Sequence, residues 1–146
     1  MFLVSQGFKV FKASKEEDMF QDIDLWVGDI PVSVKAQHEA LRYGANRSVY
    51  FELAQLERET GEWVPSWFYT GKAEKYLILQ GKELMLIDKL AVVEYIKVKP
   101  WIERTLTERR RQALIDSKRY RYVDSRCGYI LQKDVPVEKL WIIDNV

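Results

Sequence analysis

The stretch QDIDLWVGDIPVSVKAQHE, residues 21–39, decides the fold that the sequence predicts. It holds two strand-like segments, about 21–27 and 30–37, on either side of Gly28-Asp29, a pair typical of a two-residue hairpin turn. We therefore predict a β-hairpin in which Leu25 lies opposite Val32 and Asp22 lies opposite Lys35.

Alternation of side chains would give this hairpin two different faces. One face is apolar and is predicted to be core; it contains Ile23, Leu25, Val27, Ile30, Val32 and Val34. The other face carries Asp22, Asp24, Ser33, Lys35 and Gln37. Opposite residues of two antiparallel strands have Cβ atoms about 4.5–5.5 Å apart, so this register gathers two carboxylates and an ammonium group.

The polar face allows two interpretations. It can be a solvated sheet face with a Lys35–Asp22 ion pair, which would contribute less than about 1 kcal/mol to stability. Alternatively, Asp22 and Asp24 can hold Mg²⁺, which proteins bind through one or two carboxylates beside phosphates. Lys35 would then orient a water molecule or stabilise charge on a phosphate oxygen. The spacing permits both interpretations.

The rest of the chain predicts one mixed α/β domain, in which a mostly antiparallel sheet has flanking helices and the C-terminal part is helical. The expected elements are a brief helix, a break and a short strand in 1–12, a polar loop over 12–18, a strand at 48–56, an irregular aromatic segment at 57–74, a hairpin turning at Gly81-Lys82, a helix over 89–99 that Pro100 ends, a helix over about 105–119, and a tail with a strand, a turn and an apolar ending.

Composition limits the function classes. Cys127 is the single cysteine and His38 the single histidine of the 146 residues, which excludes a disulfide framework and a His/Cys zinc cage. A bound metal would need oxygen ligands. The sequence has no run of roughly 18 apolar residues and no basic start typical of a signal peptide, so we expect a cytoplasmic protein without a membrane partner. The net charge of +1 does not by itself indicate a polyanion partner.

Several basic and aromatic residues are candidates for contacts with nucleic acid. Arg109, Arg110 and Arg111 lie in a basic helix, where three consecutive residues spread around the circumference and an ordinary solvated face is the alternative. Trp67 can stack on unpaired bases or plug the open end of the sheet. The loop after the lysine-bearing strand supplies Arg42 and Arg47, and His38 can contact a phosphate or be an ordinary surface residue.

Asp24, a turn and VSVKAQ together resemble the core of the PD-(D/E)XK nuclease superfamily, in which an aspartate on one hairpin strand and an acid-x-Lys motif on the next carry the chemistry. The segments SQGFKVFKASKEEDMFQDIDLWV and WVPSWFYTGKAEKYLILQGKELMLID are similar to those that surround this motif in resolvase-like and restriction-like members. The resemblance covers about residues 3–96. It implies a single restriction-endonuclease-like domain over 1–146, with 97–146 as a basic, helical and C-terminal extension.

By this resemblance Asp24 would bind the metal, Lys35 would be the motif lysine, and Gln37 would be a polar residue beside it. Ser33 stands where the motif has its acid. The candidates for the missing carboxylate, in order, are Asp22, then Glu52 if the strand at 48–56 pairs alongside 32–37, then the loop acids Glu17 and Asp18. The helix that donates a glutamate in many members is reduced to MFLVSQ, which has no acid.

The resemblance thus implies a small Mg²⁺-dependent endonuclease in which Mn²⁺ substitutes. Its partner would be nucleic acid, with DNA ahead of RNA, and it would be structure-selective, encoded by a phage or mobile element, and able to form a homodimer. One alternative is a catalytically inactive protein that keeps the nuclease fold and binds nucleic acid or another protein, which Ser33 favours. A small structural or assembly protein is the third interpretation.

Overall fold

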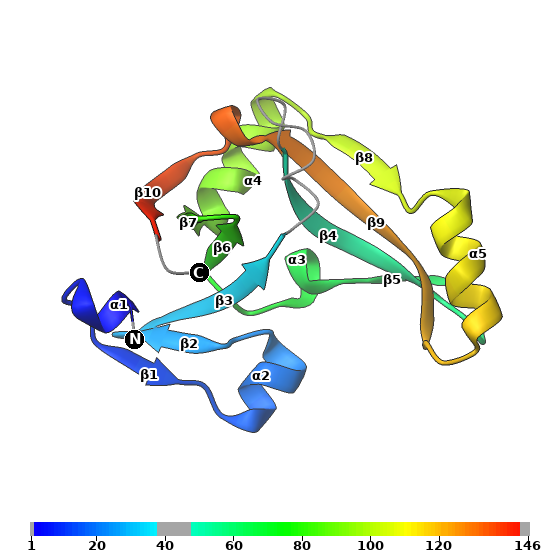
Figure 1. Ribbon diagram of the computed structural model, residues 1–146, viewed down its shortest axis with the longest axis horizontal. Coiled ribbons are helices and arrows are strands. Elements are labelled where there is room, and N and C mark those ends of the chain that lie inside the picture. Colours follow the sequence, from blue (N-terminus) through cyan, green and yellow to red (C-terminus); the bar gives the residue numbers. More distant parts are fainter. Residues whose placement is uncertain (1, 38–47, 144–146) are drawn as a thin grey trace. The chain divides into compact units, whose positions relative to one another are not determined.

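The computed structural model describes residues 2–37 and 48–143, and the chain forms two compact units. Unit 1 comprises Met1–Val49, Gly71–Pro100 and Leu131–Val146, whereas unit 2 comprises Tyr50–Thr70 and Trp101–Ile130. Each unit has its own sheet (Figure 1). Neither unit is a continuous stretch of chain, because the chain passes from unit 1 to unit 2 and back twice.

The sheet of unit 1 is mixed and mostly antiparallel. Its order is β1 (Val10–Lys12), β2 (Leu25–Val27), β3 (Ile30–Ala36), β6 (Lys75–Gln80), β7 (Glu83–Asp88) and β10 (Val137–Ile142). Only the β3–β6 pair is parallel among these neighbours. The predicted hairpin register is confirmed, because Leu25 pairs with Val32 and Val27 with Ile30. The predicted turn at Gly81-Lys82 is also confirmed, and Gly81 adopts a φ of 60° that glycine accepts without steric cost.

A helix replaces much of the predicted loop before the hairpin, and the first hairpin strand is shorter than predicted. Residues 12–18 were expected as a loop and 21–27 as a strand, but α2 spans Lys15–Gln21 and β2 begins only at Leu25. Ser14 is the N-cap of α2, and its hydroxyl accepts a hydrogen bond from the Glu17 amide while the Glu17 carboxylate accepts one from the Ser14 amide. This reciprocal capping box starts the helix, and Asp22, in the left-handed conformation with φ 52°, ends it.

The other helices of unit 1 follow the sequence pattern. The short helix α1 spans Phe2–Ser5, and α4 spans Lys89–Val98. Asp88 caps α4, since its carboxylate accepts a hydrogen bond from the Ala91 amide at 3.1 Å. As predicted, α4 ends before Pro100.

The two faces of β3 differ from the prediction. On the predicted core face, Val32 is 1% exposed and packs with Leu3, but Val34 is 42% exposed. On the predicted polar face, Ser33 and Gln37 are 0% and 1% exposed. Val34 therefore departs from the predicted core face, and the interpretation of the opposite face as solvated is wrong for Ser33 and Gln37. The physical reason for the burial of Ser33 is the position of β3 between β2 and β6, since central strands that include a parallel pair are commonly buried on both faces.

Unit 2 contains nearly all residues of the four-stranded sheet β5 (Trp63–Pro65), β4 (Ser48–Glu57), β9 (Tyr122–Leu131) and β8 (Ile102–Thr105), with α3 (Trp67–Thr70) and α5 (Glu108–Ser117). Aromatic rings form its core: Phe51 lies 5.9 Å from Trp101 and 5.5 Å from Phe68, as measured between ring centroids. Gly128 admits this packing, because a Cβ there would lie 2.3 Å from the Trp101 ring.

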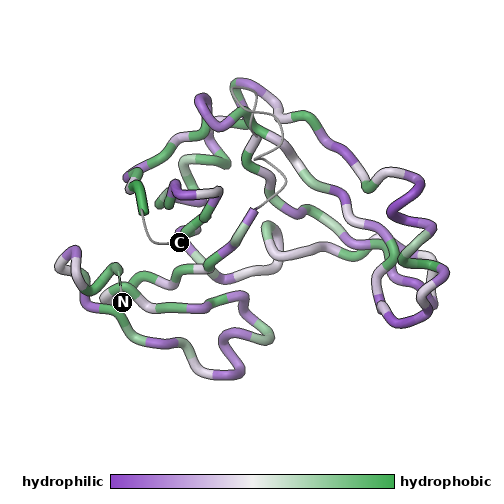
Figure 2. The backbone as a smooth tube through the Cα atoms, viewed as in Figure 1, coloured by the Kyte–Doolittle hydropathy of each residue, from purple (hydrophilic) through white to green (hydrophobic). Residues whose placement is uncertain are grey.

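The predicted helical C-terminal part is wrong. Within 97–143, the structure places α5, the only α-helix that begins in this range, together with strands β8, β9 and β10. Hydrophilic residues run through much of α5 (Figure 2), so this helix has little apolar surface with which to organise a helical subdomain. The single restriction-endonuclease-like sheet is contradicted as well, since the described chain forms two sheets. The mixed α/β class remains.

Across residues 2–37 and 48–143, no helix combines the length and apolar character that a membrane span requires.

Candidate functional site

Three carboxylates meet in unit 1 at the junction between α2 and β2. Asp18 lies on α2, Asp22 ends this helix, and Asp24 immediately precedes β2. Residues four apart on a helix lie on the same side, so Asp18 and Asp22 are brought near each other by the helix that the capping box starts. We refer to Asp18, Asp22 and Asp24 as the acid cluster.

The Asp24 carboxylate takes the place of a backbone acceptor in the sheet. Backbone pairing of the hairpin continues through the Asp24 amide, which donates to the Val32 carbonyl at 2.9 Å. Beyond this point the left-handed turn at Asp22 carries the chain away from β3. Oδ2 of Asp24 then accepts a hydrogen bond from the Val34 amide at 2.7 Å. This charge-assisted hydrogen bond fixes the Asp24 carboxylate beside β3.

Asp22 links the cluster to the lysine of β3. Its Oδ1 lies 2.8 Å from Lys35 Nζ, which is the ion pair that the hairpin register predicted. Its Oδ2 lies 3.1 Å from the Ser33 hydroxyl, which also lies 3.4 Å from Asp24 Oδ2. A serine hydroxyl has one proton to donate, so Ser33 cannot fully satisfy both carboxylates.

Asp18 shows that the cluster is crowded with negative charge. A hydrogen bond with the Asp24 carboxylate and the like charge of Asp24 raise the pKa of Asp18, and Asp22 adds to the effect. Lys12 opposes this rise. Two carboxylates that lie this close favour sharing one proton, because both cannot ionise without repulsion.

Glu17, by contrast, serves the local structure. Its carboxylate accepts the Ser14 amide at 2.8 Å and the Trp26 indole N–H at 3.0 Å. The hydrogen bond from the Ser14 amide is the main reason that the pKa of Glu17 is lowered. Of the two loop acids named as substitutes for the missing carboxylate, Asp18 therefore reaches the cluster and Glu17 caps α2.

Two residues near Asp22 were missed by sequence reasoning. Tyr76 pairs with Ser33 across the parallel β3–β6 ladder and is 1% exposed, and burial followed by the charge of Asp22 raises the pKa of its hydroxyl. Lys89 begins α4 and its Nζ donates to the Gly71 carbonyl at 3.3 Å; burial lowers its pKa, and Asp22 partly offsets the effect. No local pattern signals these neighbours, because the parallel pairing joins segments about forty residues apart.

Two other predicted site residues make different contacts. Gln37 follows β3, and its side-chain carbonyl accepts a hydrogen bond from Gln80 at 3.2 Å in a buried amide pair. Glu52 does not enter the sheet of unit 1, because β4 pairs with β5 and β9 and not with β3. The condition under which Glu52 would join the cluster, pairing of this strand alongside β3, is therefore not met. In unit 2 the Glu52 carboxylate accepts hydrogen bonds from the hydroxyls of Ser66 and Ser125.

The predicted nucleic-acid contacts are dispersed over unit 2. Trp67 packs its ring 6.1 Å from that of Phe51. Arg109 and Arg110 are exposed in the first turn of α5, whereas Arg111 Nη1 lies 3.4 Å from the buried Asp124 carboxylate. Three further candidates lie outside the described residues, and they are His38, Arg42 and Arg47.

In the described part of the chain, no group of three or more His, Cys, Asp or Glu side chains is arranged to hold a metal ion. Any ion at the acid cluster would thus be held by one or two carboxylates, with water and substrate completing its coordination, which is a usual arrangement for Mg²⁺. Hard carboxylate oxygens fit Mg²⁺ and Mn²⁺.

The chain matches no known family model, no curated protein and no solved structure in the comparisons made. The resemblance to the PD-(D/E)XK superfamily therefore stays a prediction, carried by the aspartate and the lysine of the hairpin.

Proposed function

We propose that unit 1 carries a metal-assisted site for the hydrolysis of phosphodiester bonds in nucleic acid, with DNA ahead of RNA as substrate. The observation that carries the proposal is the crowding of Asp18 and Asp24, which raises the pKa of Asp18. Fixed carboxylates that repel one another are better accommodated when a cation lies between them than when both ionise alone. Perturbed carboxyl groups beside a lysine are common at functional sites.

The donor set fits a divalent ion that prefers oxygen. Asp24 is held by the Val34 amide and Asp18 by the capped helix α2, so both carboxylates are positioned before any ion arrives. We assign these two residues as the ligands and Asp22 as the third acid of the cluster. When bound, Mg²⁺ or Mn²⁺ would polarise the phosphate and favour ionisation of a water molecule.

Lys35 is the residue that would face the substrate phosphate. Its ammonium is held by Asp22 at 2.8 Å and is partly exposed, with 22% of the side chain accessible. A positioned ammonium stabilises the negative charge that develops on a phosphate oxygen. In the net reaction a water oxygen bonds to phosphorus, the ester P–O bond breaks, and the leaving oxygen gains a proton.

The decisive experiment is a cleavage assay of the full chain with duplex, single-stranded and branched DNA and with RNA, in Mg²⁺ or Mn²⁺. We expect cleavage by the wild type and a loss of at least about 100-fold in Lys35→Ala and Asp24→Asn, the usual scale for charge-stabilising groups. Lys97→Ala is the matched control, because Lys97 is an exposed lysine of α4 paired only locally with Glu94 among the contacts described. Cleavage by the two site variants at the wild-type rate would contradict the assignment.

A second candidate function is binding of nucleic acid or another protein without catalysis. Ser33 favours it, because its hydroxyl fills the position of the motif acid and donates toward both Asp22 and Asp24. In this case the wild type would bind labelled DNA yet leave it intact with either metal. Restoring the acid in Ser33→Glu would then produce metal-dependent cleavage only if the rest of the site is competent.

A further inference from the structure

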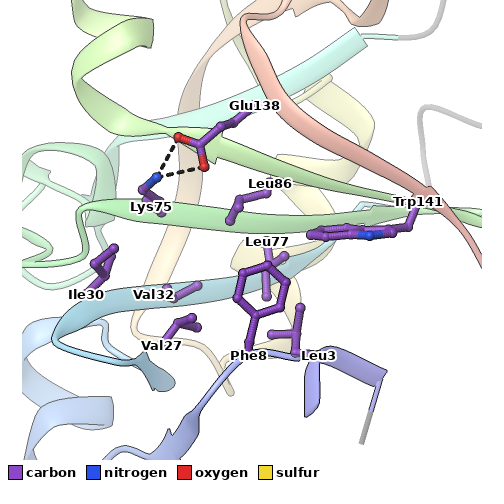
Figure 3. A pocket seen from close by; sticks show the side chains of 10 residues that line it. All are labelled: Leu3, Phe8, Val27, Ile30, Val32, Lys75, Leu77, Leu86, Glu138 and Trp141. Carbon is purple, nitrogen blue, oxygen red and sulfur yellow. Dashed lines mark hydrogen bonds and ion pairs between the residues drawn. The ribbon is translucent and has the colours of Figure 1, made fainter. Parts of the chain in front are cut away.

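Unit 1 contains a small apolar cavity on the sheet face opposite Ser33 and Lys35. Its volume is about 80 Å³, and the side chains that line it include those of Leu3, Phe8, Val27, Val32, Leu77 and Trp141 (Figure 3). The cavity lies where α1 and the segment after it pack against β2, β3, β6 and β7. Apolar side chains around such a space favour small apolar groups as occupants.

The cavity has a charged edge. Lys75 Nζ lies 2.5 and 2.7 Å from the two carboxylate oxygens of Glu138, and Figure 3 shows this pair beside the apolar side chains. Lys139 adds a second positive charge nearby, with its Nζ 5.3 Å from the centre of the Phe8 ring. The edge therefore carries two ammonium groups and one carboxylate.

Glu138 is the partner that can leave. The β10–β7 register shifts between Val137 and Lys139, so Glu138 sits in a bulge of a strand at the edge of the sheet. Bulges at sheet edges commonly redirect one side chain. The Glu138 side chain is 43% exposed, whereas that of Lys75 is only 19% exposed. Glu138 can turn into solvent, and Lys75 would then remain at the cavity without a counter-ion.

We propose that this cavity binds a short-chain monocarboxylate, whose alkyl group fills the apolar space and whose carboxylate replaces Glu138 on Lys75. One water molecule occupies about 30 Å³ in the liquid, so a cavity of about 80 Å³ accommodates roughly three non-hydrogen atoms. The three-carbon alkyl chain of butyrate matches this size. Charge selects an acid over an amine, because exchange of one carboxylate for another preserves the ion pair. This proposal is independent of the hydrolysis proposed for the acid cluster.

The primary test is calorimetric titration of the full-length protein with butyrate, butylamine and 1-butanol. We expect saturable binding of butyrate at millimolar concentration, the weak affinity that so few contacts provide, and at least about tenfold weaker binding of the other two. Shifts of the Val32 and Leu77 amide resonances would locate the ligand. Absence of saturable butyrate binding, or equal binding of butylamine or butanol, would overturn the proposal.

Variants separate a ligand site from a merely structural ion pair. Lys75→Met should weaken butyrate binding at least about tenfold, because the cation that pairs with the ligand is lost. Glu138→Gln should strengthen it about two- to fivefold, because the competing carboxylate is removed. Weaker binding in Glu138→Gln would contradict the exchange.

Two more variants test whether weaker butyrate binding could result from a loss of structure. Val32→Ile adds a methyl group to the cavity lining and should weaken butyrate binding at least about fivefold while the thermal unfolding midpoint is kept. Lys97→Met removes an exposed lysine of α4 and should bind butyrate as the wild type does. Equal affinity in Val32→Ile and wild type would place the ligand outside the cavity and overturn the proposal.

Discussion

The acid cluster of unit 1 and the Asp124 carboxylate of unit 2 show two ways in which a protein holds negative charge. Asp124 is 2% exposed, and its Oδ1 accepts the amides of Leu106 and Ser125 at 3.0 and 2.8 Å. Its Oδ2 lies 3.4 Å from Arg111 Nη1. The acid cluster instead places Asp18 against Asp24 and gives Asp22 and Asp24 a single serine hydroxyl to share.

The difference teaches which carboxylates are structural. Asp124 has two amide donors on one oxygen and the Arg111 guanidinium opposite the other, so its charge is compensated within its own unit, and its removal would leave partly buried amides unsatisfied. Asp18 and Asp24 repel each other, so the cluster is arranged at a cost to stability, as is common at sites that bind a ligand. Carboxylates of these two kinds should respond to substitution with opposite signs.

Loss of the Asp124 carboxylate should have the largest effect on stability. Asp124→Ala removes the acceptor of two backbone amides and the partner of Arg111, and we expect the free energy of unfolding to fall by about 2–4 kcal/mol. Urea denaturation followed by circular dichroism measures this change. Asp116→Ala is the control, because Asp116 is an exposed acid of α5 bound by Gln112, and its loss should cost less than about 0.5 kcal/mol. Equal effects of the two substitutions would contradict the structural role of Asp124.

Loss of the cap of α2 should have a smaller effect. Ser14→Ala removes the hydroxyl that accepts the Glu17 amide, and we expect a destabilisation of about 1 kcal/mol, the usual value for an N-cap. Because α2 carries Asp18, the same variant should also reduce the rise in unfolding midpoint that Mg²⁺ gives. Its midpoint should therefore lie further below that of the wild type with Mg²⁺ than without it. Thermal unfolding with and without Mg²⁺ measures both effects, and an unchanged response to Mg²⁺ would show that α2 does not position the cluster.

The hairpin and its lysine were predictable because local rules govern them. Gly28-Asp29 and the alternation of Leu25, Val27 and Val32 specify the register of β2 and β3. The Lys35–Asp22 ion pair forms as predicted, although Asp22 ends α2 and lies outside β2. The capping box at Ser14 could also be predicted from the sequence, since a serine followed three residues later by a glutamate is typical of a helix N-terminus. Recognition of that signal would have placed Asp18 on a helix one turn before Asp22.

The remaining features depend on long-range pairing. Tyr76 reaches Asp22 because β6 runs parallel to β3, and the chain forms β4 and β5 before it returns to β6. Glu52 belongs to a second sheet for the same reason, since the pairing of β4 with β9 joins distant segments. Val34 is exposed and Ser33 is buried because the residues packed on each face of the sheet, such as Tyr76 beside Ser33, decide burial, and alternation within the hairpin does not. Such contacts leave no periodic signal within a single segment.

Neutralisation of Asp18 should raise stability, opposite in sign to the loss of Asp124. Asp18→Asn removes one of two repelling carboxylates, so we expect a higher thermal unfolding midpoint than wild type at neutral pH without metal. The same variant should lose at least half of the rise in midpoint that Mg²⁺ gives the wild type, because Asp18 is assigned as a ligand. A lower midpoint without metal would show that Asp18 is structural, as Asp124 is.

The pH dependence sharpens this contrast and has the smallest expected effect. Because the pKa of Asp18 is raised in the folded protein, the folded state holds more protons than the unfolded chain above the ordinary value of 3.8. Asp18 therefore lowers the free energy of unfolding as the pH rises through the window between 3.8 and its raised pKa. Glu17 has a lowered pKa and acts oppositely, adding stability as the pH rises toward its ordinary value of 4.5.

The difference in free energy of unfolding between Asp18→Asn and wild type isolates the effect of Asp18. This difference should grow in favour of the variant as the pH rises from 3.8 and level off above the raised pKa. A difference that is constant from pH 3 to 7 in urea titrations would mean that Asp18 and Asp24 do not share a proton.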